Sequence, residues 1–206
     1  LSDELDYPVI IKLREEILEL PPRYIYAYSK KDRTRKYKFM HERCGFPLIQ
    51  EIILGAVYGF FGLFNDRSEL VAFFCHKRLR EYPITGGPSS YCESVYVPKI
   101  IRYGKKLLEK IRWQGVAMTE FKLDRRDGIF KIMEINPRFW GSLPLALASG
   151  VDFPYLLYQV ITGDKVNPCI KYKIGVKCRF LYRDFLALRQ ALHESEHRLD
   201  YFRDFF

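Results

Sequence analysis

The sequence has little that would place the protein in a membrane or an oxidising compartment. No apolar run approaches the roughly 20 residues that a membrane-spanning helix needs, and no signal peptide opens the chain. The five cysteines are widely spaced, odd in number and without a C-x-x-C pair, which indicates neither a disulfide framework nor a zinc or redox motif. We therefore expect reduced, mostly buried thiols in a cytoplasmic protein with no membrane partner.

Glycine is absent from the start of the chain, between Leu1 and Cys44. A loop whose backbone N–H groups wrap around phosphates needs the conformational freedom of glycine. The first part of the chain therefore lacks a Gly-rich phosphate loop. The chain also begins with leucine and comes almost at once to an apolar strand, so we expect a fragment or a shortened chain.

The sequence does have the composition of a folded domain with a surplus of positive charge. Of its 206 residues, 48% are apolar and 16% aromatic, which suits one large domain or two small ones with a sizeable core. The net charge of +9 favours a polyanionic partner, either a nucleotide or a nucleic acid or acidic membrane surface. The densest basic run, 30–38, is expected to be a solvated loop or helix face, and no nucleic-acid-binding motif accompanies it. A nucleic-acid partner is therefore the less favoured alternative.

A β-hairpin is the strongest local prediction. Two apolar runs, 115–123 and 129–135, flank the turn-forming segment 124–128, which contains a glycine. Side chains alternate along a strand, so Ile132, Glu134 and Asn136 are expected to share one face of the second strand.

Two glutamates of this hairpin predict a metal site. If Glu120 pairs with Glu134, two like charges lie on the same side of the sheet, which destabilises it unless a cation is present. Carboxylate oxygens, with the amide oxygen of Asn136, are the ligands that Mg²⁺ prefers when it also holds substrate phosphates. The alternative is that both glutamates are exposed on the wet face of an ordinary hairpin, and it stays open, although the apolar neighbours suit a half-buried surface better.

Apolar periodicity and turn signals predict the remaining elements. Strands are expected over 57–64 and 70–76 and after Gly175, and helices over 97–113, 143–149, 153–162 and 183–197.

The residues of the predicted metal site resemble a known family. Glu120, followed by Glu134-Ile-Asn136-Pro-Arg138, resembles the metal-binding signature of the ATP-grasp superfamily. The longer string 134–146, with Gly150-Val-Asp-Phe-Pro154, is similar to carbamoyl-phosphate-synthase-like ATP-grasp proteins of unassigned substrate. The resemblance implies an α+β fold, the ATP-grasp fold, in which two α+β subdomains grip ATP between antiparallel sheets.

The same resemblance implies a division of the chain into three parts. Residues 1–55 would form the small subdomain, truncated on its N-terminal side. Residues 56–174 would form the large subdomain with the metal site, and residues 175–206 a C-terminal strand and helix extension.

Contacts to the nucleotide also follow from the resemblance. Tyr7-Pro-Val-Ile-Ile-Lys12 matches a family strand whose lysine binds the nucleotide phosphates, which implies this role for Lys12. Residues 46–55 match the hinge between the subdomains, where the side chain of Gln50 and the backbone of Glu51 and Ile53 would bind adenine. No ribose ligand can be assigned.

A basic segment at 75–80 precedes a Gly-Gly-Pro-Ser-Ser loop. Guanidinium and ammonium groups recognise phosphate or carboxylate, although a charged strand end before a flexible loop is an equally good interpretation. The resemblance implies that Lys77 and Arg80 lie near the transferred phosphate and that Arg138 binds phosphate or a substrate carboxylate. His76 is not expected to bind a metal, because no second histidine lies at a suitable spacing.

The function that the resemblance implies is an ATP-dependent carboxylate–amine or carboxylate–thiol ligase that works through an acyl phosphate. Its cofactors would be ATP and Mg²⁺ or Mn²⁺, with Glu120, Glu134 and Asn136 as metal ligands. Its partners would be a small-molecule carboxylate, an amine acceptor and an N-terminal substrate domain that this chain lacks, while a homodimer stays open.

Two alternatives to the ligase remain. The missing Gly-rich loop favours a catalytically impaired module that binds nucleotide for regulation. The positive charge is the sole support for the third class, a basic nucleic-acid-binding domain.

Overall fold

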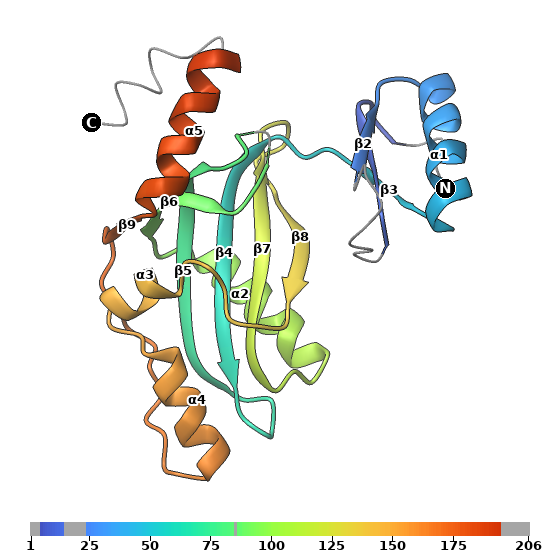
Figure 1. The fold of residues 1–206 in the computed structure, drawn as a ribbon. Helices are drawn as coiled ribbons and strands as arrows, with labels where there is room; N and C mark the ends of the chain where they lie inside the picture. The colour runs from blue at the N-terminus through green and yellow to red at the C-terminus, as the bar shows by residue number, and fades with distance from the viewer. Residues whose placement is uncertain (1–4, 15–23, 85, 195–206) are drawn as a thin grey trace. The chain divides into compact units, whose positions relative to one another are not determined.

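The structure is a computed structural model, and it describes residues 5–14, 24–84 and 86–194 (Figure 1). The chain divides into two compact units, Leu1–Leu54 and Gly55–Phe206. A Gly-rich loop would follow the first strand. Residues 15–22, which make up most of that segment, lie outside the described residues.

The first unit is a three-stranded antiparallel sheet with one helix against it. The strand order is β2-β1-β3, and apolar side chains from β1, β2 and the helix form its core, among them Val9, Ile11, Ala27 and Met40. The elements are β1 (Val9–Lys12), β2 (Tyr24–Ala27), α1 (Lys30–Cys44) and β3 (Leu48–Glu51).

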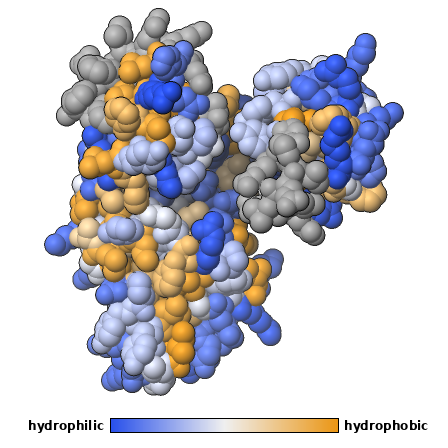
Figure 2. All heavy atoms as spheres, in the orientation of Figure 1, coloured by the Kyte–Doolittle hydropathy of each residue, from blue (hydrophilic) through white to orange (hydrophobic). Residues whose placement is uncertain are grey.

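The basic run of the sequence forms α1. Ser29 caps its N-terminus, with its hydroxyl oxygen accepting a hydrogen bond from the backbone N–H of Asp32. The Asp32 carboxylate in turn binds the side chains of Arg35 and Lys36. Figure 2 shows mainly hydrophilic side chains over this helix, so much of the run lies on its solvated face, although Arg33 is buried.

The second unit is built on a six-stranded sheet in which all neighbouring strands are antiparallel. The strand order is β8-β7-β4-β5-β6-β9. The elements are β4 (Gly55–Phe64), β5 (Leu70–Glu81), β6 (Ser89–Ser94), α2 (Pro98–Lys110), β7 (Gly115–Asp124), β8 (Phe130–Asn136), α3 (Leu143–Ala148), α4 (Phe153–Thr162), β9 (Lys177–Arg179) and α5 (Leu181–Glu194).

The two faces of this sheet are covered by different helices. Phe60 and Phe121 pack with residues of α2 on one face, and Phe61 packs with Trp140 and residues of α3 and α4 on the other. Helix α2 can approach β4 closely because Gly104 has no side chain. A Cβ at this position would lie 2.3 Å from the Phe60 ring. The sheet therefore lies between two apolar layers.

The C-terminal strand and helix belong to this second unit. Strand β9 pairs with β6, and α5 packs against β5 and β6. The α5 residue Asp184 is fully buried and accepts hydrogen bonds from Arg80 and Ser90. None of the described helices is both long enough and apolar enough to cross a membrane.

Candidate functional site

The hairpin of β7 and β8 brings the three candidate metal ligands onto one side of the sheet. Glu120 pairs directly with Glu134, and Met118 pairs with Asn136. Paired residues of neighbouring strands project to the same side, so the two carboxylates are neighbours. The Asn136 side chain donates a hydrogen bond of 2.7 Å from Nδ2 to Glu134 Oε1.

One detail of this hairpin differs from the sequence prediction. The register shifts between Glu120 and Phe121. Glu120 pairs with Glu134, whereas Phe121 pairs with Ile132. The extra residue, Met133, is a β-bulge, and it interrupts the alternation of side chains along β8. The prediction that Ile132 shares a face with Glu134 is therefore wrong, since Ile132 lies opposite Phe121.

Arg78 of β5 is the basic residue that meets the carboxylates. Its Nη2 donates to Glu120 Oε2 at 2.5 Å, and its Nη1 donates to Glu81 Oε2 at 3.0 Å. The side chains of Arg78 and Glu120 are only 11% and 14% exposed, so water screens this ion pair weakly. Burial raises the pKa of Glu120, Arg78 opposes the rise, and the charge of Glu134 adds to it.

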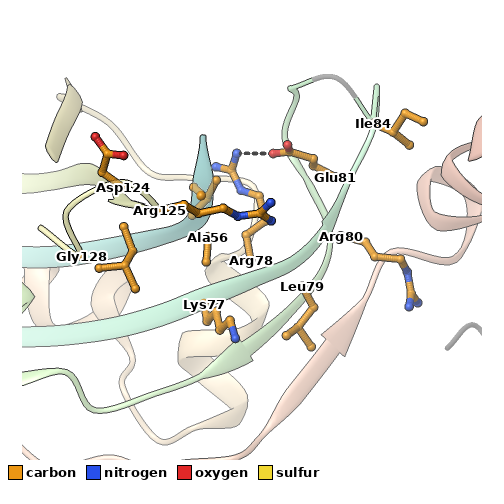
Figure 3. A pocket seen from close by; sticks show the side chains of 13 residues that line it. Ala56, Lys77, Arg78, Leu79, Arg80, Glu81, Ile84, Asp124, Arg125 and Gly128 are labelled. Atoms are coloured by element: carbon orange, nitrogen blue, oxygen red, sulfur yellow. Dashed lines mark hydrogen bonds and ion pairs between the residues drawn. The ribbon is translucent and has the colours of Figure 1, made fainter. Parts of the chain in front are cut away.

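Two of the basic residues predicted to lie near the transferred phosphate differ from Arg78 in direction or in partner. Lys77 and Arg78 project to opposite sides of β5 (Figure 3), so Lys77 lies on the side of Cys75, which packs in the apolar layer of α2. Arg80 is buried, and its guanidinium donates two hydrogen bonds to Asp184, from Nε at 2.8 Å and from Nη2 at 2.6 Å. Arg78 is therefore the residue of this segment that binds Glu120, and the roles of Lys77 and Arg80 near the transferred phosphate stay predictions.

Arg138 lies beside the candidate metal ligands. It follows β8 directly, its side chain is exposed, and its Nη2 lies 3.4 Å from Asn136 Oδ1. Of the three basic residues of the second unit predicted to act on phosphate or carboxylate, Arg138 is the one next to Asn136. Sequence reasoning missed Arg78, although alternation along β5 would have placed it on the side opposite to Lys77.

A pocket of about 660 Å³ opens where β4 and β5 separate. The last residues paired between these strands are Tyr58 and Lys77, after which β4 continues beside β7 alone and β5 beside β6. The pocket is lined by 55–57 of β4, 77–81 of β5 and residues of the β7–β8 turn (Figure 3). Arg78 lines it, so the pocket adjoins the carboxylate pair.

The candidate nucleotide residues of the first unit share one face of its sheet. Ile11 pairs with Ile49, and both pack in the core against α1. By alternation, Lys12 and Gln50 project from the opposite face. The side chains of Lys12 and Gln50 are both partly exposed, whereas Ile53 is buried.

The donor set fits magnesium better than zinc. No group of three or more His, Cys, Asp or Glu side chains that could hold a metal ion occurs within 5–14, 24–84 and 86–194. A cation that takes one or two carboxylates, an amide and otherwise phosphate and water oxygens needs no such group, and this is the usual coordination of Mg²⁺. Glu120, Glu134 and Asn136 supply these donors on one side of the sheet.

A buried histidine supports the loop that carries Arg138. His76 is 2% exposed and contacts the Phe61 ring edge to face, and its Nδ1 lies 3.1 Å from Ser142 Oγ. Burial, followed by the positive charge of Arg78, lowers the pKa of His76 to about 3. The histidine is therefore neutral, and it anchors Ser142 at the end of the 137–142 loop.

This histidine should make stability depend on pH. Its pKa is lower in the folded state than the ordinary value of 6.5, so its contribution is fully present above pH 6.5 and is lost as the pH falls toward 3. Denaturant unfolding of wild type should lose up to about 1.4 kcal/mol per pH unit in this window from His76 alone. His76→Gln should flatten the profile, whereas His193→Gln, at an exposed position of α5, should not. Equal slopes for wild type and His76→Gln would contradict the assignment.

Comparison with known proteins identifies the family. The family described as "ATP-grasp in the biosynthetic pathway with Ter operon" matches residues 76–179, which is half of the chain. The match includes Arg78, Glu120, Glu134, Asn136 and Arg138. A search of curated proteins found no match.

Solved structures with the same fold include three from bacteria. The biotin carboxylase domain of Hydrogenobacter thermophilus 2-oxoglutarate carboxylase, solved as a dimer with MgADP, ADP and bicarbonate, has a TM-score of 0.65 at 14% identity over 85% of this chain and 41% of its own. Staphylococcus aureus N5-carboxyaminoimidazole synthetase has a TM-score of 0.65 at 14% identity, over 84% and 44%. Campylobacter jejuni biotin carboxylase has a TM-score of 0.65 at 17% identity, over 86% and 42%.

The chain spans less than half the length of these three proteins. Their identities are low, so they support the fold, and they confirm the α+β ATP-grasp architecture expected from the sequence. Together with the family match, the fold and the arrangement of Glu120, Glu134 and Asn136 lead to one conclusion: the chain belongs to the ATP-grasp superfamily.

Proposed function

We propose that the chain is the ATP-binding part of a ligase that activates a carboxylate with Mg·ATP and transfers the acyl group to an amine or a thiol. The observation that carries the proposal is the strand register that sets Glu120 opposite Glu134, with Asn136 on the same side. Two facing carboxylates cost stability in an ordinary sheet, and a bound cation removes that cost. Structures of fold relatives with MgADP or ADP support this choice of ligand.

In this proposal, the second unit binds the metal and the phosphates. Glu120 and Glu134 are the carboxylate ligands of the metal, and the amide oxygen of Asn136 is its third protein ligand. When bound, Mg²⁺ or Mn²⁺ would neutralise negative charge on the β- and γ-phosphates. Arg138 would orient the carboxylate substrate, because its guanidinium is exposed next to Asn136 and can bind a carboxylate with two donors.

The first unit would bind the nucleotide. Lys12 would contact the phosphates, while the Gln50 side chain and the backbone of Glu51 and Ile53 would contact adenine. The face that Lys12 and Gln50 share by alternation supports this assignment, because both side chains can then reach one ligand.

The reaction would run in two steps without a covalent enzyme intermediate. A substrate carboxylate oxygen would attack the γ-phosphorus of ATP, and ADP would leave. The amine or thiol would then attack the acyl carbon of the acyl phosphate, and inorganic phosphate would leave. The protein would contribute by positioning and by electrostatic stabilisation, as is usual for phosphoryl transfer.

The second candidate is a nucleotide-binding module without turnover. It is favoured by one observation, the absence of glycine between Leu1 and Cys44, where the phosphate-covering loop of a ligase would need it. Both candidates require Mg·ATP binding, so only turnover separates them.

The test has two parts, thermal unfolding and ADP release. Mg·ATP at about 100 times its Kd should add about 2.7 kcal/mol to the free energy of unfolding and raise the Tm of a chain of this size by several degrees. ADP release that requires both a carboxylate and an amine or thiol, screened as sets of small molecules, would identify the ligase. A Tm shift without ADP release would favour the module, and an unchanged Tm would exclude both. Retention on RNA or DNA that falls steeply with salt, without a nucleotide response, would favour a nucleic-acid-binding domain.

A further inference from the structure

The Arg78 guanidinium is held by three acceptors. Nη2 donates to Glu120 Oε2 at 2.5 Å, and Nη1 donates to Glu81 Oε2 at 3.0 Å and to the carbonyl oxygen of Gly87 at 2.8 Å. All of these groups lie within the second unit, on β5, β7 and the β5–β6 connection. The guanidinium therefore has two contacts that fix its place and one that neutralises a candidate metal ligand.

One donor of this guanidinium has no acceptor. Arg78 Nε is buried and has no hydrogen-bond partner among the described residues. Buried donors are nearly always paired, because an unpaired one forfeits its hydrogen bond to water. Arg78 lines the 660 Å³ pocket in the fork between β4 and β5, where another acceptor could enter.

The present partner of Nη2 is also a proposed metal ligand. A guanidinium and a divalent cation against the same carboxylate repel each other, so each weakens the binding of the other. Without a metal, Arg78 supplies the positive charge that keeps the buried Glu120 carboxylate next to Glu134. When a bound metal ion supplies this positive charge, Glu120 no longer needs Arg78, and the Nη2 donor is released.

We propose that Arg78 is an internal cation that occupies Glu120 in the metal-free protein and is exchanged for magnesium when Mg·nucleotide binds. Its contacts to Glu81 and Gly87 keep the guanidinium at the site during the exchange. Nη2 and the unpaired Nε then bind an oxygen of the nucleotide phosphates, which a planar guanidinium recognises with two donors. This inference rests on the proposed function and adds a phosphate-binding residue to it.

The inference predicts that removing Arg78 changes two affinities in opposite directions. Arg78→Gln should bind Mn²⁺ without nucleotide about tenfold more tightly than wild type, because the repulsion from the competing cation is gone. The same variant should bind Mg·ADP at least about tenfold more weakly, because the phosphate loses its guanidinium. Free Mn²⁺ can be counted by electron paramagnetic resonance and Mg·ADP binding measured by calorimetry.

A second variant and a control separate this role from a structural one. Arg78→Lys keeps a cation beside Glu120, so its Mn²⁺ affinity should stay near that of wild type while its Mg·ADP affinity falls. Arg67→Gln removes the same charge from the β4–β5 turn, where the side chain is 75% exposed, and should change neither affinity. Melting curves of all variants without ligand check that they fold.

Each result of these measurements either supports or overturns the proposed exchange of Arg78 for magnesium. Tighter Mn²⁺ and weaker Mg·ADP binding by Arg78→Gln would support the exchange. Loss of both affinities, or no change in either, would overturn it while leaving the proposed metal site intact in wild type. If folded wild type binds neither Mn²⁺ nor Mg·ADP, the proposed function fails first and the exchange fails with it.

Discussion

Replacement of Asp184 by alanine is expected to lower the free energy of unfolding by about 3–5 kcal/mol. Asp184 is 0% exposed and holds the Arg80 guanidinium with two hydrogen bonds of 2.8 and 2.6 Å. Burial alone would raise the pKa of Asp184, but hydrogen bonds from Arg80 and Ser90 outweigh it and lower the pKa, so the carboxylate is charged. Its removal takes a charged partner away from a buried guanidinium of β5.

Urea unfolding of Asp184→Ala and of a control on the same helix would test this expectation. Tyr182 is 79% exposed, so Tyr182→Ala should change stability by no more than about 0.5 kcal/mol. Asp184→Asn keeps the shape and one acceptor, and should fall between the two. A loss below about 1 kcal/mol for Asp184→Ala would mean that α5 contributes little to the second unit.

The second large effect is expected at the metal site. Glu134→Gln should weaken the binding of Mg·nucleotide at least about 100-fold, because the amide keeps the shape of the side chain but lacks the charge that a hard cation requires. Without metal, this variant should be as stable as wild type or slightly more stable, because it removes a like charge opposite Glu120. The expected loss of binding is therefore not a loss of folding.

Calorimetry of Mg·ADP binding and ligand-free melting curves would measure both quantities. Glu42→Gln is the matched control, since Glu42 is an exposed residue of α1. If Glu134→Gln bound Mg·nucleotide as tightly as wild type, Glu134 would not be a metal ligand.

The hairpin that carries the candidate metal ligands was predictable from sequence because its signals are local. Alternating side chains and a glycine-containing turn define two neighbouring strands, but the turn alone would set Glu120 opposite Met133, and the register shift brings Glu134 opposite Glu120. The β-bulge at Met133 leaves no such signal, because it depends on how the two strands meet, and the placement of Ile132 was wrong for that reason.

The basic residues of β5 were harder to assign because their partners are distant in sequence. Arg80 is bound by Asp184, 104 residues further along the chain, in a helix outside the matched family region. Arg78 meets Glu120 across two strand pairings. Alternation along β5 separates Arg78 from Lys77, but no local pattern identifies the partner of either arginine.

The first unit was predicted in part. The strand before Lys12 and the helix-forming basic run have local signals, whereas β2 (Tyr24–Ala27) is short and had none that we recognised. In the second unit, β5 extends to Glu81 beyond the predicted apolar run, because its polar end is paired with β6. The likeness to carbamoyl-phosphate-synthase-like members and the role of each nucleotide contact stay predictions.

The most direct measurement of the central claim is an electron paramagnetic resonance titration of Mn²⁺ with and without ATP, on wild type and Glu134→Gln. If Glu120, Glu134 and Asn136 hold the metal of a metal–nucleotide complex, wild type should bind Mn²⁺ more tightly with ATP present, and Glu134→Gln should lose about 100-fold of that affinity. A wild-type Mn²⁺ affinity that does not change when ATP is added, or equal Mn²⁺ affinities of wild type and Glu134→Gln, would contradict the assignment of this hairpin as the metal site.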